Sequence, residues 1–239
     1  PHRLGSYELL EKVGQGAMGA VYRARHVSLK REVAVKILAT GLLGKSHALA
    51  QFRREMEAIG RLNDANVITA HDAGEVDGCH FLVTEFVDGL DLSTLVHRLG
   101  PLPLADACEL VRQAALGLEA ARQREIVHQD IKPSNLMVTP EGQVKVLDLG
   151  LVSFLPKDAD EELADQLPMG TPDYMAPERW KNWRHVDTRA DVYSLGCTLF
   201  KLLAGFAPFS QSLQSVENKA QGHLSDAVPS LRQLREDIP

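Results

Sequence analysis

The sequence predicts an α+β protein built from two lobes, and three observations support this prediction. Before residue 88, apolar and polar residues alternate in several short runs typical of β-strands, with one amphipathic helix among them. After residue 88, the apolar residues recur mainly at helical spacing. The change falls at Val87-Asp88-Gly89, which suggests a short hinge. We therefore expect a strand-rich lobe over residues 1–87 and a mainly helical lobe over residues 88–239.

Composition places the chain among globular proteins. Of its 239 residues, 44% are hydrophobic and 24% are charged, which excludes a chain that is disordered, collagen-like or a coiled coil throughout. The net charge of −6 and the lack of a basic tract argue against nucleic acid as a partner. The sequence holds no apolar run of about 18 residues, so we expect no membrane contact within it.

Two further features bear on the protein's location. Three cysteines lie far apart and form no CxxC pair: Cys79, Cys108 and Cys197. This pattern favours a reducing compartment over a disulfide framework or a zinc site, so we expect a cytoplasmic domain. The chain lacks an initiator Met, and we therefore expect a fragment of a longer protein, whose membrane anchoring the sequence leaves open.

The first lobe begins with a glycine-rich hairpin between two predicted strands, 7–13 and 20–27. In a dinucleotide-binding unit the loop Gly14-Gln15-Gly16-Ala17-Met18-Gly19 would open a helix, but here a β-branched and aromatic alternation follows it. The backbone amides of such a loop can approach phosphate oxygens closely because no Cβ intervenes. A tight hairpin with surplus glycines is the alternative interpretation of this loop taken alone.

Lys36 lies in the next predicted strand, 32–38, and Glu55 lies on the amphipathic helix predicted over 46–62. A buried ammonium needs a carboxylate partner, because an unpaired buried charge costs several kcal/mol. A Lys36 held by Glu55 could present its charge to phosphate oxygens. An edge residue with a solvated tip is the simpler alternative for Lys36. Two further runs predict the last strands of this lobe, 67–71 and 80–86.

Four segments make up the second lobe. Residues 104–118 keep helical spacing, and residues 126–148 break into short strand-like pieces around prolines. Residues 152–177 show no clear period. Residues 188–204 are apolar nearly all round, which predicts a buried central helix.

The chemistry-bearing residues of the second lobe gather at its irregular centre. Asp130, Lys132 and Asn135 share one loop, and Asp148 follows the next strand-like piece. Two Asp and one Asn suit Mg²⁺, which prefers oxygen ligands, together with a base for a hydroxyl group. Singly, each Asp could be a turn residue or a helix cap and His128 a core histidine, but the ordered set is hard to obtain by chance.

Together these motifs resemble the protein-kinase signature, and most closely that of the bacterial, eukaryote-like (Hanks-type) serine/threonine kinases. The motifs run in order over residues 6–239: Gly14 to Val21, Val33-Ala34-Val35-Lys36, Glu55, Thr84-Glu85-Phe86-Val87, His128-Gln129-Asp130, Asp148-Leu149-Gly150, Gly170-Thr171, Ala176-Pro177-Glu178 and Asp191. The resemblance implies a two-lobed kinase fold, with an antiparallel sheet and one helix in the first lobe. It also implies that the last two helices of the second lobe are absent.

The resemblance assigns the catalytic roles. Asp130 would orient and deprotonate the substrate hydroxyl, and Lys132 would neutralise charge on the transferring γ-phosphoryl group. Lys36, held by Glu55, would bind the α- and β-phosphates of ATP. Two residues would bind Mg²⁺, or Mn²⁺ in its place: Asn135 and Asp148. Thr171 would position the protein substrate, and Asp191 would brace the catalytic loop.

The same resemblance assigns the nucleotide site. Thr84 would be the gatekeeper residue beside the adenine. The residues expected to bind ATP are Gly14, Gly16, Gly19, Val21, Ala34, Lys36, Glu85, Val87, Asp91 and Met137. Among them, Val21, Ala34 and Met137 would sandwich the adenine, and Asp91 would reach the ribose. The backbones of Glu85 and Val87 would hydrogen-bond the base.

The sequence departs from the family's pattern at three places. Gln129 replaces an arginine that in relatives pairs with a phosphate on the activation segment, and a neutral side chain cannot form that charge-assisted pair. No Ser, Thr or Tyr lies between Phe154 and Gly170, so we expect activity without phosphorylation of this segment. Leu149 replaces a phenylalanine, from which we expect altered packing but retained activity. Glu178 lacks its family partner and should be exposed or paired with another cation.

An early end of the domain would also affect its stability. Without the family's last helices, apolar residues of the helix over 188–204 and of Phe206, Phe209 and Leu213 should lack a cover. We therefore expect lower stability than that of a complete domain, and self-association.

Three functions compete. The leading hypothesis is a serine/threonine kinase that transfers the γ-phosphoryl group of ATP to proteins. A pseudokinase, which would bind nucleotide or scaffold a partner, should lack at least one of the residues that carry out phosphoryl transfer, and this sequence retains them all. A nicotinamide oxidoreductase would leave the later motifs unexplained.

Overall fold

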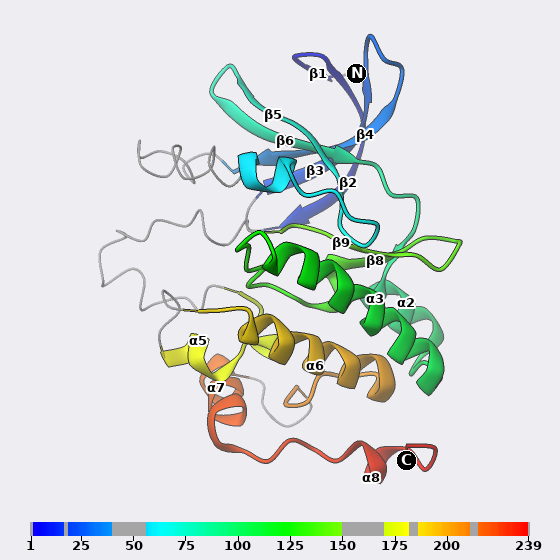
Figure 1. Ribbon diagram of the computed structural model, residues 1–239, viewed down its shortest axis with the longest axis vertical. Helices are drawn as coiled ribbons and strands as arrows, with labels where there is room; N and C mark the ends of the chain where they lie inside the picture. The colour runs from blue at the N-terminus through cyan, green and yellow to red at the C-terminus, as the bar shows by residue number, and fades with distance from the viewer. Residues whose placement is uncertain are drawn as a thin grey trace. The chain divides into compact units, whose positions relative to one another are not determined.

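A computed structural model describes residues 2–16, 19–39, 56–149, 170–181, 186–210 and 215–238. The described residues divide into two compact units (Figure 1). The sheet unit comprises the described residues of 1–64 and 68–88, and the helical unit comprises those of 65–67, 89–153 and 157–239.

The sheet unit is a six-stranded sheet with the strand order β1-β2-β3-β4-β6-β5, and every neighbouring pair is antiparallel. Its strands are β1 (His2–Leu4), β2 (Tyr7–Gly16), β3 (Gly19–His26), β4 (Glu32–Leu38), β5 (Ala70–Val76) and β6 (Cys79–Glu85). The strands predicted at 7–13, 20–27, 32–38 and 80–86 are confirmed as β2, β3, β4 and β6. Residues 56–60 are helical, and the rest of that predicted helix before residue 56 lies outside the described residues.

The strand predicted at 67–71 is wrong in its position. Val67 is 1% exposed and forms an isolated parallel bridge with Val146 in the helical unit. The strand instead occupies Ala70–Val76, where no residue is fully buried and apolar and polar residues do not alternate regularly. Backbone pairing with β6 at the sheet edge accounts for this strand, because an edge position tolerates residues of low β-propensity.

Apolar residues that alternate with polar ones along the strands form the core of the sheet unit. Val33 and Val35, two residues apart on β4, are both fully buried. They join a cluster of buried residues: Leu4, Tyr7, Ala24, Val33, Val35, Phe81 and Val83. At the mouth of the hairpin, Gly19 has a φ of +140°, and a Cβ there would lie 1.9 Å from the Ile37 carbonyl oxygen. Only glycine therefore allows β3 to pair with β4 at this point.

The helical unit carries a small sheet beside its helices. The sheet has the order β7-β8-β9, formed by Leu90–Asp91, Leu136–Val138 and Val144–Val146. The α-helices are α2 (Leu92–Leu99), α3 (Leu104–Arg122), α5 (Pro177–Lys181), α6 (Arg189–Ala204), α7 (Val216–Ser225) and α8 (Leu231–Leu234). The helices predicted at 104–118 and 188–204 are confirmed as α3 and α6, which pack against each other (Figure 1).

The prediction that α6 lacks a cover is wrong for most of its apolar residues and holds for Val192, which is 69% exposed. Phe200, Leu203 and Phe209 are each at most 5% exposed, and Phe206 is partly buried. Helices α2, α3, α5 and α8 all contact α6, which accounts for the burial of its apolar residues. Leu213 lies outside the described residues, and self-association stays a prediction. No described helix combines the length and hydropathy that a bilayer crossing requires.

Candidate active site

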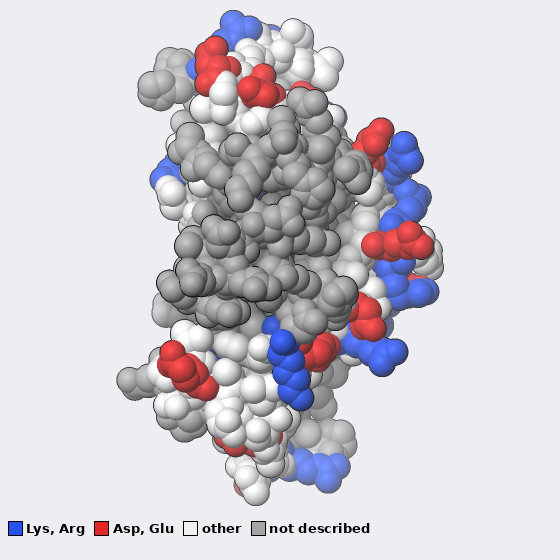
Figure 2. Space-filling model, turned by 90° about the vertical axis from the view of Figure 1, so that its left-hand side faces the viewer, with Lys and Arg blue, Asp and Glu red and all other residues white. Residues whose placement is uncertain are grey.

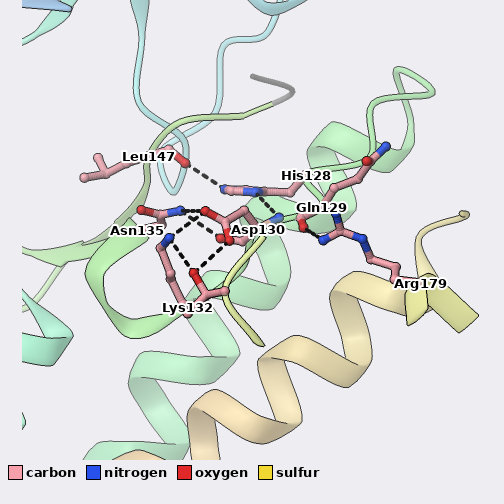
Figure 3. A network of polar contacts seen from close by, with 8 residues as sticks. His128, Gln129, Asp130, Lys132, Asn135, Leu147 and Arg179 are labelled. Carbon is pink, nitrogen blue, oxygen red and sulfur yellow. Dashed lines mark hydrogen bonds and ion pairs between the residues drawn. The ribbon is translucent and has the colours of Figure 1, made fainter. Parts of the chain in front are cut away.

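The predicted catalytic residues lie in the helical unit, on the loop that joins α3 to β8 (Figure 3). This loop is held by Asp191 in the first turn of α6, a residue only 4% exposed. Its two carboxylate oxygens accept hydrogen bonds from the backbone N–H groups of His128 and Gln129, both at 2.8 Å. Burial raises the pKa of Asp191, and the two N–H groups and the charge of Arg179 oppose that shift. A residue 63 positions away along the chain thus fixes the start of the loop.

His128 connects the loop to the segment that ends at Asp148. Its ring is fully buried, with Nδ1 3.2 Å from the backbone N–H of Asp130 and Nε2 2.7 Å from the Leu147 carbonyl oxygen. Because Nδ1 accepts from an N–H group, Nε2 carries the ring proton and donates a hydrogen bond to the Leu147 carbonyl oxygen. His128 is therefore a core histidine that also holds the loop against the segment before Asp148.

The Asp130 carboxylate is the centre of the polar network (Figure 3). Lys132 Nζ donates to Asp130 Oδ2 at 2.7 Å and to Thr171 Oγ1 at 2.7 Å. The Thr171 hydroxyl donates to Asp130 Oδ1 at 3.2 Å. Asn135 Nδ2 donates to the Asp130 backbone oxygen at 2.8 Å and to Oδ2 at 3.2 Å. The structure thus brings Asp130, Lys132, Asn135 and Thr171 together in one network.

A partly exposed carboxylate beside an ammonium suits proton and phosphoryl chemistry. The side chains of Asp130 and Lys132 are 17% and 23% exposed, so substrate can reach them while solvent is limited. The carboxylate can accept a proton from a hydroxyl, and the ammonium can stabilise negative charge that develops nearby.

A backbone hydrogen bond brings together the two residues expected to bind metal, Asn135 and Asp148. The Leu147 N–H donates to the Asn135 carbonyl oxygen at 2.9 Å, and Asp148 directly follows Leu147. Asn135 is 8% exposed and donates from its amide nitrogen, which orients the amide with its oxygen away from Asp130. Asp148 has a φ of +55°, an uncommon conformation for a non-glycine residue that often marks a functional site. This oxygen donor set fits a hard divalent cation.

No protein cage for a metal forms within the described ranges. Groups of three or more His, Cys, Asp or Glu side chains arranged to hold a metal are absent among these residues. Two protein ligands completed by phosphate oxygens and water are the usual arrangement for Mg²⁺.

The nucleotide-site residues of the sheet unit occupy β2, β3, β4 and β6. Gly14 pairs with Val21 and Gly16 with Gly19, which closes the glycine hairpin. Ala34 pairs with Thr84 across β4 and β6, and Lys36 on β4 is 9% exposed. Glu55, the predicted partner of Lys36, lies outside the described residues, so the Lys36–Glu55 pair stays a prediction.

Glu85 is bound to Thr69. The Glu85 N–H donates to the Thr69 carbonyl oxygen at 2.9 Å, and the Glu85 carboxylate accepts from the Thr69 N–H at 2.8 Å. Val87 follows β6 in an irregular segment and is partly buried.

Asp91 and Met137, the nucleotide-site residues of the helical unit, face each other in the register of β7 and β8. Asp91 caps helix α2, because its carboxylate accepts from the Thr94 N–H at 2.9 Å and from the Thr94 hydroxyl at 2.6 Å. These bonds hold the carboxylate still, and each oxygen has a further lone pair for a ribose hydroxyl.

Leu149 and Glu178 are departures from the family's pattern whose predicted placement can be checked among the described residues. Leu149 is 2% exposed, so it fills an interior position as expected. Glu178 is exposed, which is one of the two outcomes expected for it. The stretch 150–169, which carries most of the activation segment, lies outside the described residues.

Sequence reasoning missed Arg179. This residue is 4% exposed, and its guanidinium donates a hydrogen bond to the Gln129 carbonyl oxygen (Figure 3). The only signal in the sequence is its place directly after Ala176-Pro177-Glu178. A five-residue helix has too little periodicity to show which side it buries.

Known proteins are similar to this chain over most of its length. The family model described as the protein kinase domain matches residues 7–237. Serine/threonine-protein kinase PknB of Mycobacterium leprae is 37% identical over 213 residues, a match that covers 87% of this chain and 34% of PknB. Serine/threonine-protein kinase PknD of Mycobacterium tuberculosis is 36% identical over 234 residues, covering 98% of this chain and 34% of PknD. The chain therefore spans about a third of the length of these curated relatives.

A solved structure is also similar. The crystal structure of a mutant PknI kinase domain from Mycobacterium tuberculosis matches with a TM-score of 0.72 and 28% identity. The match covers 97% of this chain and 82% of the PknI chain. These similarities confirm the resemblance that the motifs predicted, and they confirm the predicted fold.

Proposed function

Because the chain belongs to the protein kinase family, we propose that it transfers the γ-phosphoryl group of ATP to Ser or Thr hydroxyl groups of proteins. The observation that carries this proposal is the network in which Asp130 accepts hydrogen bonds from Lys132 and Thr171. Phosphoryl transfer depends mainly on positioning and charge stabilisation, and this network supplies both.

Asp130 accepts the proton of the substrate hydroxyl in this proposal. The hydroxyl must come within about 2.6–3.2 Å of a carboxylate oxygen, and in doing so it competes with the bond from Thr171. Lys132 contacts both Asp130 and Thr171, and this position supports the proposal that its ammonium acts where an attacking oxygen and a phosphoryl group would meet. Its fixed charge stabilises the negative charge of the transition state.

Asn135 and Asp148 would hold a divalent cation. Members of this family use ATP and a divalent metal, which would supply positive charge to neutralise the phosphate oxygens. We propose Mg²⁺, with Mn²⁺ able to take its place. Asn135 also orients Asp130 through two hydrogen bonds, so one residue links the metal position to the base.

The sheet unit would bind the nucleotide. Lys36 would contact the α- and β-phosphates, with Glu55 as its partner, and the glycine hairpin would cover them. The adenine would lie among Val21, Ala34 and Met137, as the family resemblance implies. In this proposal the sheet unit and the helical unit are the two lobes of the kinase.

Replacement of Asp130 by Asn tests the proposal. This substitution preserves shape and removes the proton acceptor, so kcat should fall by about 10²–10⁴-fold. ATP affinity should stay near that of the wild type, because Asp130 is not among the residues that bind the nucleotide. The measurement is single-turnover transfer from labelled ATP to a Ser/Thr peptide library, with nucleotide binding measured separately. Equal transfer by the wild type and Asp130→Asn, with ATP bound, would favour the pseudokinase alternative.

Two further arms of the same assay test the finer points. Peptides that carry Ser, Thr or Tyr at one position should be phosphorylated on Ser or Thr and not on Tyr. Removal of divalent cations by a chelator should abolish transfer, and added Mg²⁺ or Mn²⁺ should restore it. Transfer that persists in the chelator would contradict the roles of Asn135 and Asp148.

A further inference from the structure

Arg179 on α5 lies against the catalytic loop, and neither the motifs nor the family's roles used above account for it. The guanidinium donates to the Gln129 carbonyl oxygen, 50 positions away along the chain. Gln129 has a φ of +67°, a left-handed conformation that is unfavourable for a non-glycine residue. A donor on its carbonyl oxygen stabilises this conformation directly before Asp130.

The same guanidinium lies against the chain that leads into Thr171. A Cβ on Gly170 would lie 3.1 Å from Arg179 Nη1 and 3.2 Å from the Met175 methyl carbon. Gly170 also has a φ of +139°, which L side chains rarely adopt. The missing side chain thus leaves room for the guanidinium. Arg179 therefore packs between the residue before Asp130 and the residue before Thr171.

Three carboxylates stabilise the charge of this buried arginine. Burial lowers the pKa of Arg179, and the negative charges of Asp130, Asp191 and Glu178 oppose that shift. Arginine stays protonated in proteins, so the guanidinium is a permanent cation beneath the loop. Its planar fork can hold a carbonyl oxygen and still interact with carboxylates, which the single ammonium of lysine does less well.

We propose that Arg179 is a positioning residue that holds Asp130 and Thr171 in their reactive arrangement, and that it does so without a phosphate on the activation segment. The proposal rests on the proposed function, because it concerns the same network. In this chain Gln129 offers no cation to a phosphate, and no Ser, Thr or Tyr lies between Phe154 and Gly170. The buried guanidinium supplies from within the domain a fixed link between the catalytic loop and the Thr171 segment.

Two substitutions at Arg179 and one matched control test this role. Arg179→Met removes the charge and the donors, and Arg179→Lys keeps the charge with a different geometry. Lys181→Met removes a charge from the exposed end of the same helix. We expect kcat to fall by about 10²-fold in Arg179→Met and by less in Arg179→Lys, because misplacement by about 1 Å can cost 10²-fold. The KM for ATP should not change, and Lys181→Met should match the wild type.

A double-mutant cycle with Thr171→Val separates positioning from a general loss of stability. If Arg179 acts through Thr171 and Asp130, the losses in kcat from Arg179→Lys and Thr171→Val should be less than additive, whereas independent effects add. Phosphatase treatment of the wild type should leave its kcat unchanged. Thermal unfolding midpoints of all variants show which are folded, and Arg179→Lys decides the matter if Arg179→Met does not fold.

Several results would overturn the proposal. Wild-type kcat in Arg179→Lys, fully additive losses in the cycle, or a rise in the KM for ATP that matches the fall in kcat would each do so. Loss of activity on phosphatase treatment through a site in residues 151–175 would also overturn it. An inactive wild type would instead overturn the proposed function, and this proposal with it.

Discussion

The sheet unit and the catalytic loop are held by different kinds of interaction. In the sheet, β3, β4 and β6 pair along their backbones, and apolar side chains such as Val33 and Val35 fill one face. In the loop, backbone N–H and carbonyl groups are bound by buried side chains from elsewhere in the chain, chiefly Asp191 and Arg179. A substitution in the sheet removes a share of a distributed stabilisation. A substitution under the loop leaves buried polar groups without partners, which costs more and displaces the reactive groups.

Exposed charges on the surface differ from the buried charges beneath the loop. Lys and Arg side chains alternate with Asp and Glu along part of one face of the molecule (Figure 2). On α3, Arg112 and Arg122 form exposed ion pairs with Glu109 and Glu119, and both carboxyl pKa values are lowered to about 2 by these arginines. Exposed pairs of this kind contribute little to stability. The buried pairing beneath the loop is the one that we expect to matter.

The largest expected effect comes from Asp191→Ala. This substitution leaves the N–H groups of His128 and Gln129 unsatisfied and removes a carboxylate beside buried Arg179. The free energy of unfolding should fall by about 3–5 kcal/mol. The kcat of the folded fraction should fall by about 10²-fold, because the loop carries Asp130. Denaturant unfolding and single-turnover transfer measure the two losses.

Asp187→Ala is the matched control for this change. Asp187 lies just before α6 and carries the same charge, but it is exposed. Its carboxylate accepts from the Arg189 N–H at the start of α6, so its replacement should lower the free energy of unfolding by about 1 kcal/mol, well below the loss in Asp191→Ala. If Asp191→Ala keeps the wild-type kcat, the loop does not depend on its buried acceptor and the contrast with the sheet fails.

Val35→Ala should destabilise the core of the sheet unit without changing kcat. Val35 is fully buried on β4, and the loss of two methyl groups should lower the free energy of unfolding by about 2 kcal/mol. The kcat at saturating ATP should stay at the wild-type value, because Val35 points into the core cluster. A fall in kcat comparable to that of Asp191→Ala would show that the sheet's core and the reactive groups are coupled.

His223→Gln should give the smallest effect, and it sharpens the comparison by testing a buried polar side chain away from the loop. His223 on α7 is 5% exposed and lies 2.8 Å from the Tyr193 hydroxyl. Burial lowers its pKa, and the Asp173 carboxylate opposes that shift. The unfolded chain therefore takes up a proton at higher pH than the folded chain does. The stability that neutral His223 contributes is present above its unfolded pKa of about 6.5 and is lost as the pH falls below it.

The measurement is the free energy of unfolding between pH 7 and pH 5. The wild type should lose stability over this range relative to His223→Gln, and kcat per folded molecule should not follow the same curve. His97→Gln removes an exposed histidine at the end of α2 and should show the wild-type slope. Parallel curves for the wild type and His223→Gln would contradict the prediction.

The sequence by itself determined most of the architecture and grouped the residues that we propose to be catalytic. Strand alternation predicted β2, β3, β4 and β6, and helical spacing predicted α3 and α6, because these patterns arise from local geometry. Asp130, Lys132 and Asn135 were predicted as one group because they share a short loop. The family resemblance added Asp191 as the residue that braces this loop, and its two bonds to the loop bear this out.

Only the tertiary structure decided how that group is held together. Thr171 reaches Asp130 across 41 positions, and Arg179 reaches the Gln129 carbonyl across 50. β5 lies at Ala70–Val76 because it pairs with β6, while Val67 bridges to Val146. No residue pattern of period 2 or 3.6 encodes such contacts, since they depend on which distant backbone groups folding leaves buried and in need of a partner.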